Sequence, residues 1–243
     1  MTEPSGVRRT RAERASLTRD RVIAAAVALA DEKGAAGVTM RAVAARLGVE
    51  AMSLYHHVSS RDGILDGMVD AVFAEIGPPP AAAPWQAALR DRAVSVRAAL
   101  RRHPWAVGLL DSRAAPGPAT LRHHDAVLGC LRTGGFSVKM AVHAMSVIDS
   151  YLYGFVLQER SLPFANPADA GAVADGILRG LPAGSHPYLA EVVAEQLRAA
   201  GYDHTTEFEF GLDLILDALG PDEPESAGRG GAPARGDGGG GPG

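Results

Sequence analysis

The chain has 243 residues, 47% of them hydrophobic and 21% charged, which is ordinary for a globular protein. Its single cysteine, Cys130, excludes an internal disulfide framework and is typical of a reducing compartment. The first residues are polar and arginine-rich, unlike a signal peptide, and no run approaches the ~18 apolar residues of a membrane span. We therefore expect a soluble, cytoplasmic protein with no membrane partner.

The net charge of −4 conceals an uneven distribution. Residues 1–62 hold ten Lys or Arg against seven Asp or Glu, whereas the remainder holds fourteen against twenty-one. Six of those ten cations are Arg8, Arg9, Arg11, Arg14, Arg19 and Arg21. A basic head on an acidic body indicates a polyanion partner for the head. On charge alone, a solvated and flexible arm over residues 1–16 is an equally good interpretation.

Residues 17–77 carry the pattern of a small helical head. Thr18 can cap a first helix, which Gly34 and Gly37 end. Thr39 can cap a second helix, and Gly48 supplies the positive φ of a sharp turn into a third helix. That third helix is expected over 50–57, and a fourth begins near residue 60.

A proline-rich connector then leads to a larger helical body over residues 84–220. Helical spacing predicts the segments 85–102, 118–133, 138–160, 187–200 and 206–219. Residues 161–186 are rich in glycine and proline and are expected to be mostly loop. Residues 221–243 hold nine of the 29 glycines, so we expect a disordered tail there. No segment alternates like a strand, and the predicted class is all-α.

The stretch 39–58 carries most of the functional information. Its second half presents hydroxyls, imidazoles and a phenol in place of an ordinary charged face. Such donors bond phosphate oxygens and base edges, and a short helix after a tight turn fits the major groove of DNA. The sequence therefore predicts a helix-turn-helix DNA reader.

The segment from Leu17 to Ile76 resembles the DNA-binding head of the TetR (tetracycline repressor) family. The resemblance is carried by Thr39, Arg41, Ala44, Leu47-Gly48-Val49, Leu54-Tyr55-His56-His57-Val58 and Arg61. It continues through Trp85-Gln86, Gly134-Gly-Phe136-Ser137 and Phe208-Glu-Phe210-Gly-Leu212-Asp-Leu214, as in the body of the tetracycline repressors themselves. The resemblance implies an N-terminal head for DNA and a C-terminal helical domain for a ligand and for dimerisation.

Carried over by position, the resemblance implies a supporting helix over residues 39–47 and a recognition helix, which reads the DNA, over residues 50–57. The implied contacts with bases or phosphates come from Thr39, Arg41, Met52, Ser53, Tyr55, His56, His57 and Arg61. Where family members often show Gln-Pro, this chain has Ala51-Met52, so base reading is expected to lean on apolar contact with thymine methyls. Tyr55 can alternatively pack between helices, His56 and His57 can be surface residues, and Met52 can be a partly exposed filler.

For the ligand, the most informative positions are those at which this chain differs from the tetracycline repressors. Tetracycline repressors hold a magnesium–drug chelate with a histidine and a glutamate, and these places fall here at Leu110 and Gln158. Neither is a good magnesium ligand, so we expect neither a tetracycline nor a metal, and no other cofactor. The remaining implied pocket residues are Arg113, Val127, Val142, Met145 and Asp149. They favour a largely apolar small molecule, although Val127, Val142 and Met145 at helical spacing are also typical of plain core.

Together these observations favour a homodimeric repressor that is released from a palindromic operator in double-stranded DNA by a small effector. The helix from residue 206 and that around 151–157 are expected to form the contact between the two copies. An activator or a global DNA-binding regulator with the same head is the alternative. An α-helical enzyme or carrier is a weaker one, because the sequence offers no nucleophile with a paired base, metal cluster or cofactor loop.

Overall fold

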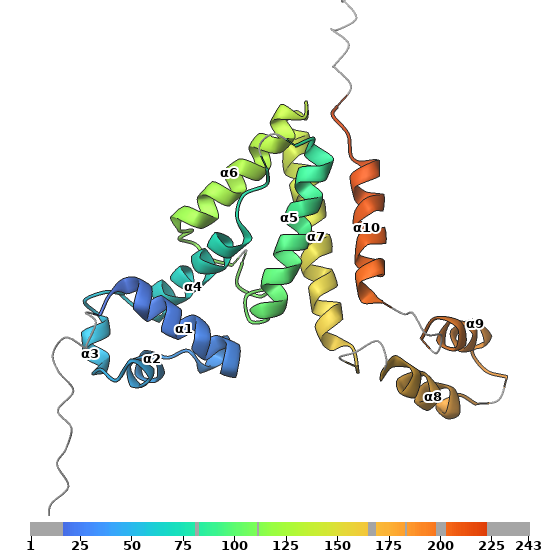
Figure 1. Cartoon of the computed structure of the whole chain (residues 1–243), viewed down its shortest axis with the longest axis horizontal. Coiled ribbons are helices and arrows are strands. Elements are labelled where there is room, and N and C mark those ends of the chain that lie inside the picture. Colours follow the sequence, from blue (N-terminus) through green and yellow to red (C-terminus); the bar gives the residue numbers. More distant parts are fainter. Residues whose placement is uncertain are drawn as a thin grey trace, which may run out of the picture.

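The structure is a computed structural model that describes residues 17–80, 83–110, 112–164, 169–182, 184–197 and 203–222. Within these ranges the chain forms helices, turns and loops and contains no strand (Figure 1). The expected all-α class is therefore confirmed. The arm predicted at 1–16, and all but the first two residues of the tail predicted at 221–243, lie outside the described residues.

Four helices form the head: α1 (Arg19–Lys33), α2 (Met40–Leu47), α3 (Ala51–Leu54) and α4 (Arg61–Ile76). Side-chain oxygens begin three of them, since Thr18, Thr39 and Ser60 each accept a hydrogen bond from the backbone amide three residues later. Glycines at positive φ follow α1, α2 and α4. The local sequence thus sets both ends of these helices.

The head is held together by apolar side chains that its helices bury against one another. Val22 of α1, Val43 of α2, Leu54 of α3 and Met68 of α4 are all completely buried. The same core continues along α4 into the body. Helix α4 therefore belongs to both cores and can transmit movement of the body to the head.

The main part of the body consists of α5 (Trp85–Arg102), α6 (Pro118–Thr133), α7 (Val138–Ser161) and α10 (His204–Ala218). In Figure 1, α5, α7 and α10 lie side by side and α6 leans toward α4. By length and composition α7 could cross a membrane. It instead packs against α5, α6 and α10 and buries Asp149 in an ion pair, so it is a core helix of the body.

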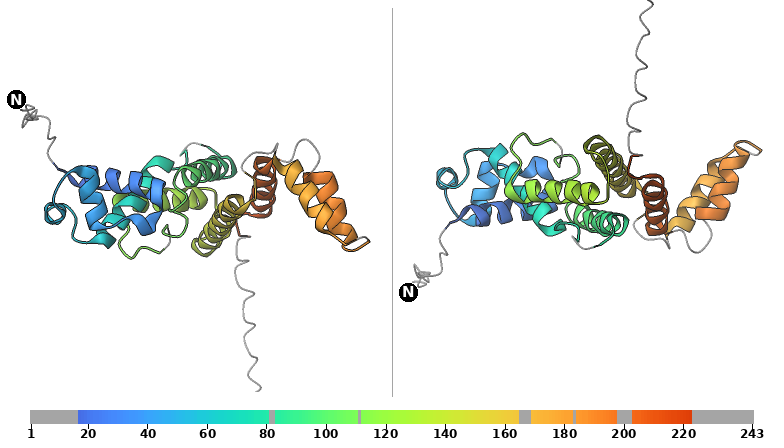
Figure 2. Two further views of the ribbon diagram at one scale, coloured as in Figure 1. Left: turned by 90° about the horizontal axis from the view of Figure 1, so that it is seen from below. Right: turned by 90° about the horizontal axis from the view of Figure 1, so that it is seen from above.

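One segment of the body differs from the sequence-based expectation. Residues 161–186 were expected to be mostly loop, yet they contain α8 (Ala170–Gly180). That helix packs against the π-helical turn Val193–Leu197, which continues α9 (Pro187–Val192), and both views of Figure 2 show this α8–α9 hairpin standing away from the other helices. The expectation failed because α8 contains three glycines among its 11 residues, and packing outweighs their low helix propensity.

Candidate functional site

Helices α2 and α3 lie at the outer end of the head, away from α10 and the hairpin (Figure 1). Gly48 joins them with φ of 67° and ψ of 34°, the left-handed conformation that glycine adopts without strain. A side chain at this position would meet no neighbouring atom, so the backbone conformation alone demands the glycine. The turn closes with a hydrogen bond from the Val49 amide to the Ala44 carbonyl.

The reading helix is shorter than expected. Regular helix covers only Ala51–Leu54, and the expected remainder, 55–57, forms a turn. The amides of Ser53, Tyr55 and His57 bond the carbonyls three residues before them, a tighter winding than the four-residue spacing of an α-helix. The turn ends where Val58 and Leu54 anchor it in the core.

The residues expected to meet DNA are mostly exposed on this end of the head. Met52 is 73% exposed and Tyr55 is 49% exposed. Thr39, Arg41 and His56 are also exposed, and Ser53 and His57 are half-buried. The alternative that Tyr55 is mainly a packing aromatic is not favoured, because half of its surface faces solvent. Apolar and hydrogen-bonding groups are thus available together for a groove.

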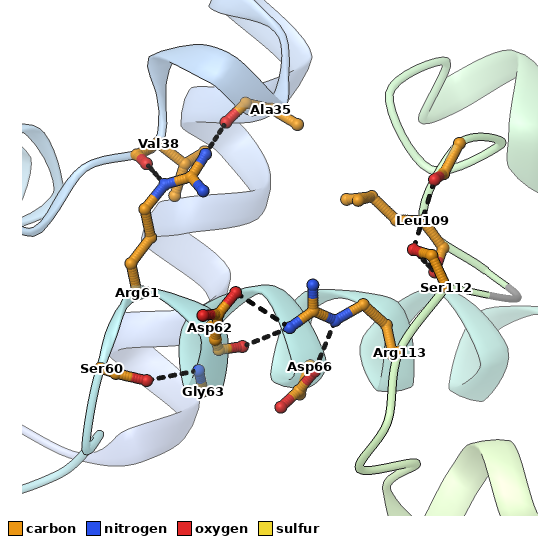
Figure 3. Close-up of polar contacts among 11 residues, drawn as sticks. Ala35, Val38, Ser60, Arg61, Asp62, Gly63, Asp66, Leu109, Ser112 and Arg113 are labelled. Carbon is orange, nitrogen blue, oxygen red and sulfur yellow. Dashed lines mark hydrogen bonds and ion pairs between the residues drawn. The ribbon is translucent and has the colours of Figure 1, made fainter.

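Arg61 has a different environment from the one expected. Its Nε donates to the Val38 carbonyl at 2.7 Å and its Nη2 donates to the Ala35 carbonyl at 3.0 Å (Figure 3). These bonds tie the start of α4 to the loop before α2. Arg61 therefore supports the position of the helix-turn-helix, and its contact with DNA backbone stays a prediction.

The residues expected to bind a ligand do not gather in one place. Leu110 and Arg113 line a cavity of about 240 Å³ between α4 and α6. Val127 is completely buried core, Met145 is partly buried against it, and Val142 and Gln158 are exposed on α7. Position along the sequence determines neither the rotation of a helix nor its neighbours, and the role of these residues in ligand binding stays a prediction.

Asp149, the remaining expected ligand residue, belongs to a buried polar network. Arg92 donates through Nη2 to Asp149 Oδ1 at 2.8 Å and through Nε to His123 Nε2 at 2.9 Å. His123 Nδ1 in turn lies 3.0 Å from the Gly77 carbonyl, which it can reach only as a donor. Burial, with the nearby charge of Arg92, lowers the pKa of His123 to about 4. The imidazole is therefore neutral, with both ring nitrogens occupied.

A second polar group joins the end of α5 to the head. Asp31 of α1 accepts a hydrogen bond from the Trp105 indole at 2.7 Å and lies 2.8 Å from His103 Nδ1. The other ring nitrogen of His103 lies 3.1 Å from Glu75 of α4. The sequence did not predict this junction because its contacts join residues 28 to 74 positions apart and no local pattern marks them.

Known proteins share this arrangement of a helix-turn-helix head on a helical body. Residues 22–68 match the family description "Bacterial regulatory proteins, tetR family", and residues 78–220 match "Tetracyclin repressor-like, C-terminal domain". The chain belongs to the TetR family. It is therefore a DNA-binding transcriptional regulator whose head is a helix-turn-helix.

Individual TetR-family proteins match the chain over most of its length. It is 34% identical to the HTH-type transcriptional repressor DrrR1 of Streptomyces coeruleorubidus, over 88% of this chain and 82% of that protein. It is 30% identical to the class E tetracycline repressor of Escherichia coli, over 83% of this chain and 90% of that protein. The structure of Streptomyces coelicolor ActR in complex with actinorhodin superposes with a TM-score of 0.70, at 28% identity, covering 84% of this chain and 96% of that one.

Proposed function

We propose that the protein is a cytoplasmic, homodimeric repressor that a small and largely apolar molecule releases from a palindromic operator. Each α2–α3 unit would enter a major groove, with the two half-sites separated by a turn of the DNA or a multiple of it. The observation that carries the proposal is the exposed Met52–Tyr55–His56 surface on a helix-turn-helix of TetR type. The protein acts by binding and has no enzymatic role.

The proposed contacts with DNA are of two kinds, those that can reach bases and those that hold phosphates. Met52 and Tyr55 offer apolar surface for thymine methyls, and the Tyr55 hydroxyl and His56 imidazole offer hydrogen bonds to bases or phosphates. Thr39 and Arg41 at the start of α2, with Ser53 and His57, position the head on the phosphates. Thr39 already accepts the Ala42 amide, so its hydroxyl hydrogen is free to donate to a phosphate oxygen.

Exposed apolar side chains support a dimer formed through α7 and α10. Phe210 is 63% exposed and Leu214 is 57% exposed, one helical turn apart on α10, and Val142 of α7 is half exposed. Large apolar groups on one face of packed helices are typical of an interface with a second copy. Two-fold symmetry of the protein would match a palindromic operator.

The effector would occupy the body. That a small molecule binds is supported by the structure of ActR in complex with actinorhodin. The cavity between α4 and α6 is lined by apolar Val69, Leu110 and Leu121 and by polar Asp66 and Arg113. This mixture suits a small apolar molecule oriented by a few polar groups. The molecule would shift the population toward a dimer whose heads are wrongly spaced for the operator.

Binding to a duplex from the promoter region of the protein's own gene tests the proposal. We expect a salt-sensitive band shift at about 10 nM dimer. Replacing Tyr55 and His56 with alanine should abolish it and leave a folded dimer, whereas Tyr188→Ala, at an exposed site on α9, should not. Absence of the shift with the unmodified protein would refute DNA regulation at this promoter.

A further inference from the structure

Three carboxylates follow one another at every fourth residue of α4. Asp62, Asp66 and Asp70 lie on the same face because four residues make about one helical turn. All three contact the segment 113–120, which leads from the loop after Leu110 into the first turn of α6. We call Asp62, Asp66 and Asp70 the carboxylate row.

Arg113 bonds the first two members of the row (Figure 3). Its Nε donates to Asp66 Oδ1 at 2.6 Å, and its Nη2 lies 3.2 Å from Asp62 Oδ1. The side chains of Arg113 and Asp66 are only 16% and 20% exposed, whereas that of Asp62 is 75% exposed. Because water screens an exposed charge more than a shielded one, the Asp66 pair provides most of the attraction.

Asp70 supplies a cap that α6 lacks. The N-cap position of α6 is Gly117, which has no side chain to bond the first amides of that helix. Asp70 Oδ1 accepts instead from the Thr120 amide at 2.8 Å and from the Thr120 hydroxyl at 3.0 Å. A carboxylate is also favoured there by the helix dipole. A Cβ on residue 117 would lie 2.3 Å from the Asp70 carboxyl carbon, so only glycine permits this approach.

The row also borders the cavity between α4 and α6. Asp66 and Arg113 both line it, and Thr120 lies on its wall. A molecule in this cavity therefore touches the Asp66–Arg113 pair and Thr120, the residue that Asp70 bonds. Rotation of α4 by even a small angle would lengthen these short bonds, and the head moves with α4.

We propose that the carboxylate row fixes the head in the operator-binding position relative to α6, with Arg113 and Asp70 as positioning residues. The inference rests on the proposed function. A molecule in the cavity would change the orientation of the head through the contacts of the carboxylate row. Neither residue lies on the α2–α3 surface. A head without these contacts samples other orientations, and only the competent fraction binds two half-sites.

The first test compares operator affinities. Arg113→Gln and Asp66→Asn should each lower the affinity about tenfold, and the double variant should lose little more, because both remove the same pair. The matched control is Arg90→Gln, which removes an ion pair with Asp213 between α5 and α10. We expect the control to stay within about twofold of the unmodified protein.

The second test follows amide hydrogen exchange without DNA. Asp70→Ala should speed exchange at the Thr120 amide, and Arg113→Gln should speed exchange in the first turns of α4 and α6. Arg90→Gln should leave both regions unchanged. Circular dichroism and sedimentation establish that each variant keeps its fold and oligomeric state.

The outcomes separate this proposal from the proposed function. An unmodified protein that binds no duplex refutes the function and with it the operator role of the row. If the unmodified protein binds the operator but Arg113→Gln binds it as tightly as Arg90→Gln, or more tightly than the unmodified protein, only the role of the row is overturned. Unchanged exchange in α4 and α6 of Arg113→Gln likewise overturns it.

Discussion

His123 makes the free energy of unfolding depend on pH. Its pKa is lowered to about 4 by burial and by Arg92, below the ordinary value of about 6.5 that it regains on unfolding. Between these two values the unfolded chain binds more protons than the folded chain. The free energy of unfolding therefore falls as the pH drops from about 6.5 to about 4, by on the order of 2–3 kcal/mol from this residue.

Chemical denaturation at pH 7.5 and at pH 4.5 measures this loss. His123→Gln retains an acceptor for Arg92 but cannot take up a proton, so its stability should change less between the two pH values. The difference between the two proteins isolates His123 from other groups that titrate in the window. Equal pH dependence of both would contradict a buried neutral His123.

Single-residue roles were predicted unevenly from the sequence. All residues expected to contact DNA except Arg61 come from one short motif at positions 39–58, and the structure exposes most of them, while their contacts with DNA stay a prediction. Asp149 was assigned to a ligand because the sequence does not reveal that Arg92, 57 residues away, bonds it in the core. The i, i+4 spacing of Asp62, Asp66 and Asp70 is visible in the sequence, but its partners come from another helix and a loop.

At the scale of elements, α7 and α10 approach closely at Gly211. Tyr151 of α7 lies over this glycine, and its hydroxyl donates to the Phe208 carbonyl at 2.8 Å. A Cβ on residue 211 would lie 2.4 Å from the Tyr151 hydroxyl oxygen. Gly211→Ala should therefore destabilise the protein by about 1–3 kcal/mol, although alanine favours a helix by about 1 kcal/mol.

Gly129 of α6 provides the control for this substitution. It is exposed, and a Cβ there would meet no atom within 4 Å. Gly129→Ala should raise the free energy of unfolding by about 0.5–1 kcal/mol, because only helix propensity changes. Thermal and urea unfolding measure both variants, and a Gly211→Ala protein as stable as Gly129→Ala would disprove the tight crossing.

Element boundaries were predictable where a cap or glycine marks them. Thr18 and Thr39 cap helices as predicted, α4 begins near residue 60 as predicted, and Gly48 turns the chain. The length of α3 and the existence of α8 were not predictable. In both, the outcome depends on how the segment packs against its neighbours and not on local residue preference.

At the scale of the whole molecule, the two ends of the chain carry different tasks. Residues 1–62 carry a net positive charge and include α2 and α3 at the outer end of the head, whereas the acidic remainder presents apolar side chains on α7 and α10. Charge repels two bodies, so their association has to come from apolar burial. Raising the salt concentration should then weaken operator binding but not the dimer, which band shifts and sedimentation at two salt concentrations distinguish.

The proposed dimer can be broken at one exposed position of α10. Leu214→Glu places a carboxylate in the apolar face beside Phe210, and in a dimer two such charges would be buried near the symmetry axis. We expect monomers in sedimentation and a loss of operator affinity of about a hundredfold or more, since each half-site is then bound alone. Leu121→Glu makes the same change at an equally exposed leucine on α6, and it should remain dimeric. If Leu214→Glu also remained a dimer with full affinity, the two copies would have to meet through another surface.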